Sequence, residues 1–224
     1  MHSEKAAGLK GRSVSDQSGP LSAAWGHPDT PMTGRGSSPQ IDGNRHTLGR
    51  VEGPPEASAG LWVPGEAGSS EYREPPLSEH TLKSIEAELG VRLPAAYVSM
   101  ARTHNGGLLK RNAHPSPAPT TWATDHVAVT GIFAIGRTVR ASLCGALGQR
   151  LWLEEWGYPA IGVYFADTPS AGHDIIALDY RASGPAGEPS VVHVDQEVGY
   201  KVTPLARTFE DFIAGLVGDD AFQV

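Results

Sequence analysis

Apolar and polar positions divide the chain into two parts of different texture. From Leu61 onward, apolar residues recur at the spacings of helices and strands, whereas over 1–60 they are few and follow neither period. The first part holds 10 Gly, 6 Pro and 8 Ser, and so little apolar surface cannot offset the entropy lost on ordering the backbone. The sequence predicts a disordered or loosely packed extension over 1–60, a folded domain over 61–217 and a short tail over 218–224.

Two consecutive helices are predicted at the start of the folded domain. Ser78 is a suitable N-cap for a first helix with one apolar face, and Gly90 supplies its C-terminal stop. Leu93 then leads into Pro94, whose missing N–H suits the first turn of a second helix. A corner that permits positive φ is predicted at the end of this helix, formed by Asn105, Gly106 and Gly107.

Short runs rich in β-branched and aromatic residues follow, and Gly, Pro and Asp separate them. Strands are predicted within 127–135, 160–166, 175–180, 191–195 and 200–202, with a short helix at 150–156. Thr208 is the predicted N-cap of a final helix with an apolar face. Helices at both ends with strands between them predict an α+β fold, in which N- and C-terminal helices wrap a mixed, mostly antiparallel sheet.

Charge is distributed unevenly between the two parts. The formal net charge of −7 belongs to residues 61–224, which hold 12 Lys/Arg and 19 Asp/Glu, because residues 1–60 hold six of each kind. The domain therefore lacks the clustered cations that bind nucleic acid, and no direct nucleic-acid binding is expected. A basic protein partner is electrostatically favoured. The alternative interpretation is that mild acidity only keeps the protein in solution.

Other sequence signals concern location and chemistry. No run of 18 apolar residues is present and no apolar stretch follows the first residues, so neither a membrane span nor a secretory signal is expected. The single cysteine, Cys144, fits a reducing compartment, and we expect the protein in the cytoplasm. The chain has none of the common catalytic, phosphate-binding or dinucleotide motifs, so no enzyme activity, cofactor or metal is expected.

One cluster has residue types that could perform chemistry. His173, Asp174 and Asp179 could bind a metal or act as acid and base, which would make the protein a metal-dependent hydrolase. Three ligands spread over one hairpin make a poor metal motif. The favoured interpretation is structural, with the aspartate turning the chain and the histidine bonding to a neighbouring strand.

Partner-binding residues are sought among exposed aromatic and acidic side chains. Trp and Tyr dominate the energetics of protein interfaces, but most of the aromatic residues here are expected in the core. Trp122 is the exception, because it lies in a Pro- and Thr-rich loop of the kind that carries recognition at a surface. Asp125 and Glu197 are candidate contacts with a basic partner, since both are predicted in exposed loops.

An ordered set of short motifs over 61–217 resembles the SUKH superfamily, the domains related to Smi/Knr cell-wall-assembly regulators. The residues that carry the resemblance are Leu93, Pro94 and Tyr97, the Asn105-Gly106-Gly107 corner, then Trp156, His173, Asp174, Asp179, Glu188 and Pro189. Each motif occurs in many proteins, but the complete ordered set is specific to this superfamily.

The resemblance implies a sheet wrapped by helices and a role in binding another protein. Bacterial members are commonly immunity proteins that neutralise polymorphic or contact-dependent toxins, often nucleases or deaminases, and fungal relatives are regulatory scaffolds in cell-wall assembly. The superfamily has no common catalytic apparatus. We therefore expect an immunity protein whose partner is a basic toxin domain, with a scaffold that binds a cell-wall or housekeeping enzyme as the alternative.

Overall fold

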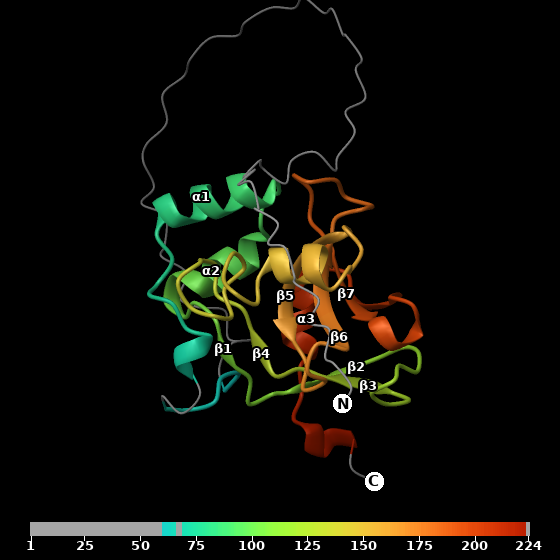
Figure 1. Ribbon diagram of the computed structural model, residues 1–224. Coiled ribbons are helices and arrows are strands. Elements are labelled where there is room, and N and C mark those ends of the chain that lie inside the picture. The colour runs from blue at the N-terminus through green and yellow to red at the C-terminus, as the bar shows by residue number, and fades with distance from the viewer. Residues whose placement is uncertain (1–59, 66–68, 223–224) are drawn as a thin grey trace, which may run out of the picture.

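The computed structural model of the chain describes residues 60–65 and 69–222 (Figure 1). The predicted extension, except for Gly60, and the last two residues of the predicted tail lie outside the described residues. Leu61 is fully buried, and Trp62 forms an isolated bridge with Leu109. Leu61 and Trp62 are therefore packed into the domain.

The first predicted helix is α1 (Glu79–Leu89). The Oγ atom of its N-cap, Ser78, accepts a hydrogen bond of 3.1 Å from the backbone N–H of Thr81. Gly90 ends the helix with φ 70°, in the left-handed region that favours glycine. The apolar face of α1 is buried, as its periodicity predicts.

The second helix is α2 (Ala95–Thr103), and Pro94 is its N-cap. The joint between the helices is fixed because Glu86 Oε1 accepts a hydrogen bond of 2.8 Å from the backbone N–H of Leu93. Leu93 is itself buried. The Leu93-Pro94 motif thus sets the direction in which α2 leaves α1.

A six-stranded sheet in the order β1-β4-β5-β6-β7-β8 forms the centre of the domain, and every strand pair in it is antiparallel. Its strands are β1 (Gly107–Leu108), β4 (Gly131–Ile132), β5 (Gly162–Asp167), β6 (Asp174–Asp179), β7 (Ser190–Asp195) and β8 (Lys201–Ala206). A separate hairpin pairs β2 (Ala113–Pro115) with β3 (His126–Ala128). The predicted strand region 127–135 is thus divided between two sheets.

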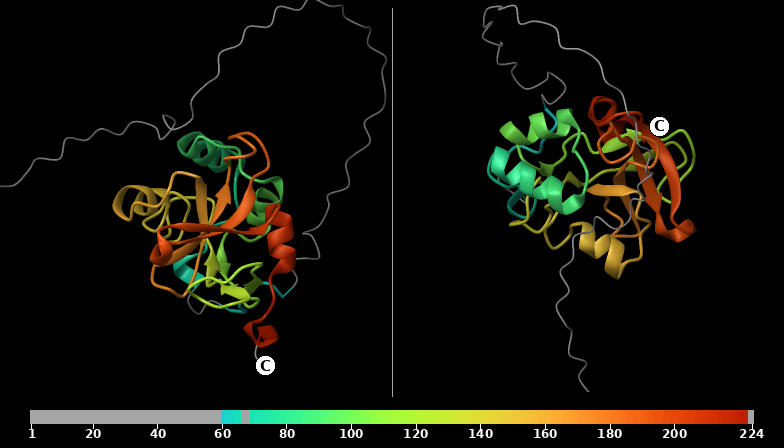
Figure 2. Two further views of the ribbon diagram at one scale, coloured as in Figure 1. Left: turned by 90° about the vertical axis from the view of Figure 1, so that its right-hand side faces the viewer. Right: turned by 90° about the horizontal axis from the view of Figure 1, so that it is seen from above.

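Strand β5 is covered on both faces, because adjacent residues of a strand point to opposite sides. On one side Tyr164 packs near Trp152, which belongs to a π-helical turn, Leu151–Glu155. On the other side the Phe165 ring lies 5.5 Å from that of Phe209, in helix α3 (Phe209–Gly215). Figure 2 shows α3 and the π-helical turn on opposite sides of the sheet. This double burial explains the uninterrupted apolar run in β5.

Helix α3 closes the domain from the C-terminal side. Its N-cap Thr208 accepts a hydrogen bond of 3.0 Å from the backbone N–H of Asp211. The Phe209 ring stacks on Tyr97 of α2 with centroids 4.6 Å apart, so the terminal helices meet on one face of the sheet. Beyond α3, a 3-10 turn (Asp219–Phe222) lies within the predicted tail. The α+β prediction, with a mostly antiparallel sheet between N- and C-terminal helices, is confirmed.

Asn105, at the corner after α2, joins the segment before α1 to the segment after β4. The Asn105 side chain is 2% exposed; its amide donates to the carbonyl oxygens of Pro75 and Ile135 at 3.1 Å each, and its oxygen accepts from Ile135 N–H at 2.8 Å. Gly106 has φ 78°, and a Cβ atom there would collide with the Tyr72 carbonyl oxygen. Residue 106 must therefore be glycine, and the amide group of Asn105 bonds to backbone groups on both sides of the corner.

We predict that Asn105→Ala lowers the free energy of unfolding by about 3 kcal/mol, because it removes the side-chain partner of three backbone groups, two of which are buried. Urea denaturation of the full chain measures the loss. The control is Asn112→Ala, since Asn112 Oδ1 accepts one exposed hydrogen bond of 3.2 Å, from Asp219 N–H. It should cost less than about 1 kcal/mol. Equal losses in the two variants would contradict the role given to Asn105.

Candidate functional site

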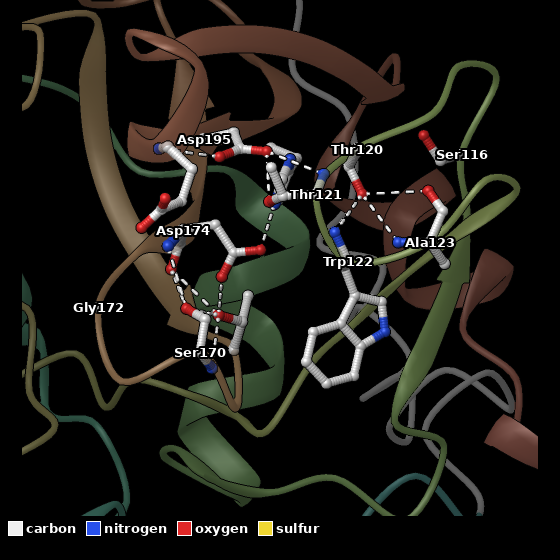
Figure 3. Close-up of polar contacts among 12 residues, drawn as sticks. Ser116, Thr120, Thr121, Trp122, Ala123, Ser170, Gly172, Asp174 and Asp195 are labelled. Carbon is white, nitrogen blue, oxygen red and sulfur yellow. Dashed lines mark hydrogen bonds and ion pairs between the residues drawn. The ribbon is translucent and has the colours of Figure 1, made fainter.

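Three aspartates lie together at one end of the sheet. Asp167 ends β5, Asp174 begins β6 and Asp195 ends β7, and Asp174 and Asp195 are register partners across the antiparallel strands. Asp174 is 3% exposed and Asp195 is 1% exposed. A buried carboxylate needs donors in place of water. The surrounding loops supply these donors, as Figure 3 shows for Asp174 and Asp195.

Asp195 joins two loops that are far apart in the sequence. Its Oδ2 atom accepts hydrogen bonds from the backbone N–H of Thr121 at 3.1 Å and from Thr121 Oγ1 at 2.7 Å. Its Oδ1 atom accepts from the backbone N–H of Glu197 at 3.1 Å, at the start of a 3-10 turn (Gln196–Val198). One buried carboxylate therefore fixes the connection between β2 and β3 against the turn between β7 and β8.

Trp122 follows the anchored Thr121 and carries its indole at the surface, 42% exposed. Its backbone N–H donates to Thr120 Oγ1 at 3.2 Å, and Thr120 N–H donates to the Ala123 carbonyl oxygen at 2.9 Å (Figure 3). Val198, on the other side of the Asp195 junction, is 49% exposed. Two of the three exposed large hydrophobic side chains in the described part of the chain thus flank Asp195.

The two acidic residues predicted to bind a partner have exposed side chains in the two loops that Asp195 joins. Asp125 Oδ1 lies 2.8 Å from His126 Nδ1, and Glu197 Oε1 lies 2.6 Å from His173 Nδ1. We call Trp122, Asp125, Glu197 and Val198 the Trp122 surface. Sequence reasoning missed Asp195, although an aspartate directly after the apolar run 191–194 could have indicated a buried, bonded carboxylate.

Asp174 forms a second network at the same end of the sheet. Its Oδ2 lies 2.7 Å from His193 Nε2, its Oδ1 accepts from Thr168 Oγ1, and its backbone N–H donates to Ser170 Oγ at 3.0 Å. Burial alone would raise the pKa of Asp174, but the hydrogen bonds to its side chain outweigh burial and hold the pKa below its ordinary value. His193 is fully buried on β7. The carboxylate therefore ties the loop before β6 to β7.

The residues of the hydrolase alternative do not come together. Asp174 and Asp179 lie at opposite ends of β6. Asp179 Oδ2 accepts a hydrogen bond of 2.6 Å from Arg181 Nη2, whereas the exposed His173 pairs with Glu197. Among the described residues, no three His, Cys, Asp or Glu side chains are grouped to hold a metal ion. The geometry therefore does not gather these three side chains into one site.

Two further motif residues lie just before β7, at the opposite end of the sheet from Asp195. Glu188 is exposed, and Pro189 is buried. A buried proline is suited to the position directly before a strand, because proline has no N–H group to donate to the hydrogen bonds of the sheet.

A groove of about 500 Å³ runs between the π-helical turn and the loop that joins β5 to β6. Most of its exposed lining is apolar, and Leu147, Trp152, Trp156 and Gly172 are among the residues that line it. A Cβ atom on Gly172, which has φ 98°, would lie 2.7 Å from the Trp156 indole, so the loop packs closely on that ring. We call this the Trp156 groove. Single π-helical turns occur often at functional sites.

Asp167 lines the same groove and differs from the other two aspartates. Tyr72 Oη donates to its Oδ2 atom at 2.5 Å, whereas Oδ1 is buried with no hydrogen-bond partner among the described residues. No Lys, Arg or His of the described chain forms an ion pair with it. Burial outweighs the bond from Tyr72 and the smaller effects of the backbone N–H groups of Asp167 and Gly131, and it raises the pKa of Asp167 to about 6. Within the described residues, this carboxylate therefore lacks a balancing charge.

The architecture and the bonded loops at one sheet end define an α+β domain with a preformed surface. Residues 76–215 match the model of the SMI1 / KNR4 family (SUKH-1). The match covers more than half of the chain, and the protein belongs to this family, as the motifs predicted. No curated protein and no solved structure gave a significant match. In the described residues, no helix has the length and apolarity needed to cross a membrane.

We predict that Asp167→Asn raises the stability of the domain at pH 7.5 by about 1–3 kcal/mol. The pKa of Asp167 in the folded state, about 6, exceeds the unfolded value of about 4, so stability present below pH 4 is lost as pH rises through 6. The variant escapes this loss, and its advantage should shrink as pH falls from 6 to 4. Urea denaturation at several pH values measures the difference; a constant difference would contradict the uncompensated carboxylate.

Proposed function

We propose that this SUKH-1 domain is a protein-binding module that acts as an immunity protein and neutralises a basic bacterial toxin domain. The observation that carries the proposal is the exposed Trp122, held by the hydrogen bonds of Thr121 to the buried Asp195. An indole on a fixed backbone loses little conformational entropy when it binds, so more of its contact energy stabilises the complex. Trp is also the residue type most enriched at interface hot spots.

Charge supports a basic partner. The net charge of −7 belongs to residues 61–224, and Asp125 and Glu197 lie exposed on the Trp122 surface. The superfamily's toxin partners are often nucleases or deaminases, and proteins that act on nucleic acid bind phosphates with Lys and Arg. An acidic protein with an aromatic anchor is complementary to such a cleft.

The proposed mechanism is stoichiometric occlusion of the toxin's substrate cleft. Trp122 inserts as the anchor and Val198 extends the apolar contact, while the two acidic residues pair with cations that would otherwise hold the substrate. The hydrogen bonds of Asp195 keep both loops in place before binding. No residue of the domain needs to perform chemistry in this mechanism.

We predict that Trp122→Ala weakens binding to the toxin encoded beside this protein's gene by about 30-fold or more. Calorimetry measures the affinity, and survival of cells that express the toxin measures protection. The control is Val63→Ala, because Val63 is similarly exposed, at 40%, but lies in the segment before α1; it should change affinity less than about threefold. Should pull-downs recover cell-envelope or housekeeping enzymes and no toxin, the scaffold function replaces immunity.

A second prediction concerns the rate of association with the same toxin. The association rate constant should fall at least about tenfold between roughly 0.05 and 0.5 M salt, while the dissociation rate changes less, because salt screens long-range attraction. Glu197→Gln should reduce this dependence, whereas Glu79→Gln, a change in the exposed first turn of α1, should reduce it less. Stopped-flow measurements decide, and a rate independent of salt would contradict electrostatic steering.

A further inference from the structure

The Trp156 groove has the properties of a receptor for one long side chain. Its volume of about 500 Å³ lies in the range of specific binding pockets. The rings of Trp152 and Trp156 are 5.9 Å apart and inclined at 57°, which gives the groove aromatic walls. In the loop beside Trp156, the backbone of Ala171 has φ 59°, in the left-handed region that residues other than glycine seldom adopt. Strain of this kind persists where the surrounding structure holds it in place.

Charges in the lining determine what kind of side chain fits. Asp174 also lines the groove, but Thr168 and His193 occupy its two oxygens. The groups that bond to the Asp167 carboxylate are neutral, namely the Tyr72 hydroxyl and the backbone N–H groups of Asp167 and Gly131, and it forms no ion pair within the described chain. The carboxylate that remains unbalanced in the groove is therefore Asp167.

Arg140 lies at the same groove and would repel a cation. Its side chain is 58% exposed, and its Nη1 atom is 3.9 Å from Glu71 Oε1. Water and Glu71 thus screen the charge of Arg140, whereas Asp167 lies in a less polar setting where charges interact more strongly. The balance favours a positively charged occupant.

We propose that the Trp156 groove receives a lysine or arginine side chain of the partner protein, with its methylene groups along Trp156 and its cation directed toward Asp167. The aromatic walls favour a cation in contact with a ring face, and the apolar lining suits the stem of a basic side chain. The occupant's origin in a protein rests on the proposed function. The groove would give the domain a second contact with a basic partner, separate from the Trp122 surface.

The test uses the full chain labelled with ¹⁵N and three blocked amino acids as probes: Nα-acetyl-lysine methylamide and its norleucine and glutamate analogues. The indole N–H signals of Trp152 and Trp156, assigned with Trp156→Phe, report binding at millimolar concentration. The lysine probe should shift both signals in a saturable manner and bind at least about fivefold more tightly than the norleucine probe.

Variants separate the charge of Asp167 from other effects. Asp167→Asn should weaken lysine binding about fivefold or more while the norleucine affinity stays the same, and Arg140→Gln should strengthen lysine binding about twofold. The matched control is Glu155→Gln, an exposed residue of the π-helical turn that does not line the groove; it should leave all affinities within about twofold. Unfolding curves for each variant confirm that it is folded.

Three results would overturn the proposal. Equal binding of the lysine and norleucine probes would make the groove an apolar anchor only. Preferred binding of the glutamate probe, lost in Arg140→Gln, would make it an anion site. Saturable binding of no probe would show that it is no receptor. Because the toxin is absent from this experiment, a negative result here would not contradict the proposed role of the Trp122 surface. Equally, a fully protective Trp122→Ala variant would contradict that role but not the proposal for the groove.

Discussion

Two carboxylates at one end of the sheet, those of Asp174 and Asp195, are buried and need hydrogen-bond donors from the protein, and this constraint arranges the loops of the domain. Asp195 can be buried only with the donors of Thr121 and the turn after β7. Asp174 needs Thr168 and His193. A charge left unpaired at such depth would cost several kcal/mol. Loops that are distant in the sequence are therefore held at this one end, where the exposed residues of the domain form a fixed surface.

The three carboxylates differ in how far hydrogen bonds compensate for their burial. Asp174 and Asp195 are bonded through both oxygens, and such networks stabilise one arrangement of the backbone. Asp167 accepts a hydrogen bond from Tyr72, and its own backbone N–H and that of Gly131 also favour the charged form, but burial outweighs them and raises the pKa. Its ionised form therefore lowers stability at neutral pH. Natural proteins tolerate such a cost mainly where function requires it. The same residue type therefore stabilises the fold at two positions and lowers stability at the third, and the balance between burial and hydrogen bonding distinguishes them.

Local patterns predicted the helices and most of the strands, because caps, glycine stops and apolar periods act over a few residues. Ser78, Gly90 and Thr208 all have the predicted roles at helix ends. The sequence did not reveal that His193 is the partner of Asp174 or that Thr121 is the partner of Asp195. These pairs depend on strand register and on a loop that crosses to another sheet, and neither is encoded in local spacing. The sequence grouped His173 with Asp174 because the two are adjacent, but the histidine that bonds to the Asp174 carboxylate is His193, and His173 pairs with Glu197.

The loop between β5 and β6 links the two candidate binding regions. Its residue His173 pairs with Glu197 of the Trp122 surface, while Gly172 packs against Trp156 and its carbonyl oxygen accepts a hydrogen bond of 2.7 Å from Tyr158 Oη. A movement of this loop would alter both regions together. The network of Asp174 opposes that movement, because it holds the loop at Thr168 and Ser170. A partner that covers both regions would meet them at a fixed separation, so binding at one would place its second contact without further ordering of the loop.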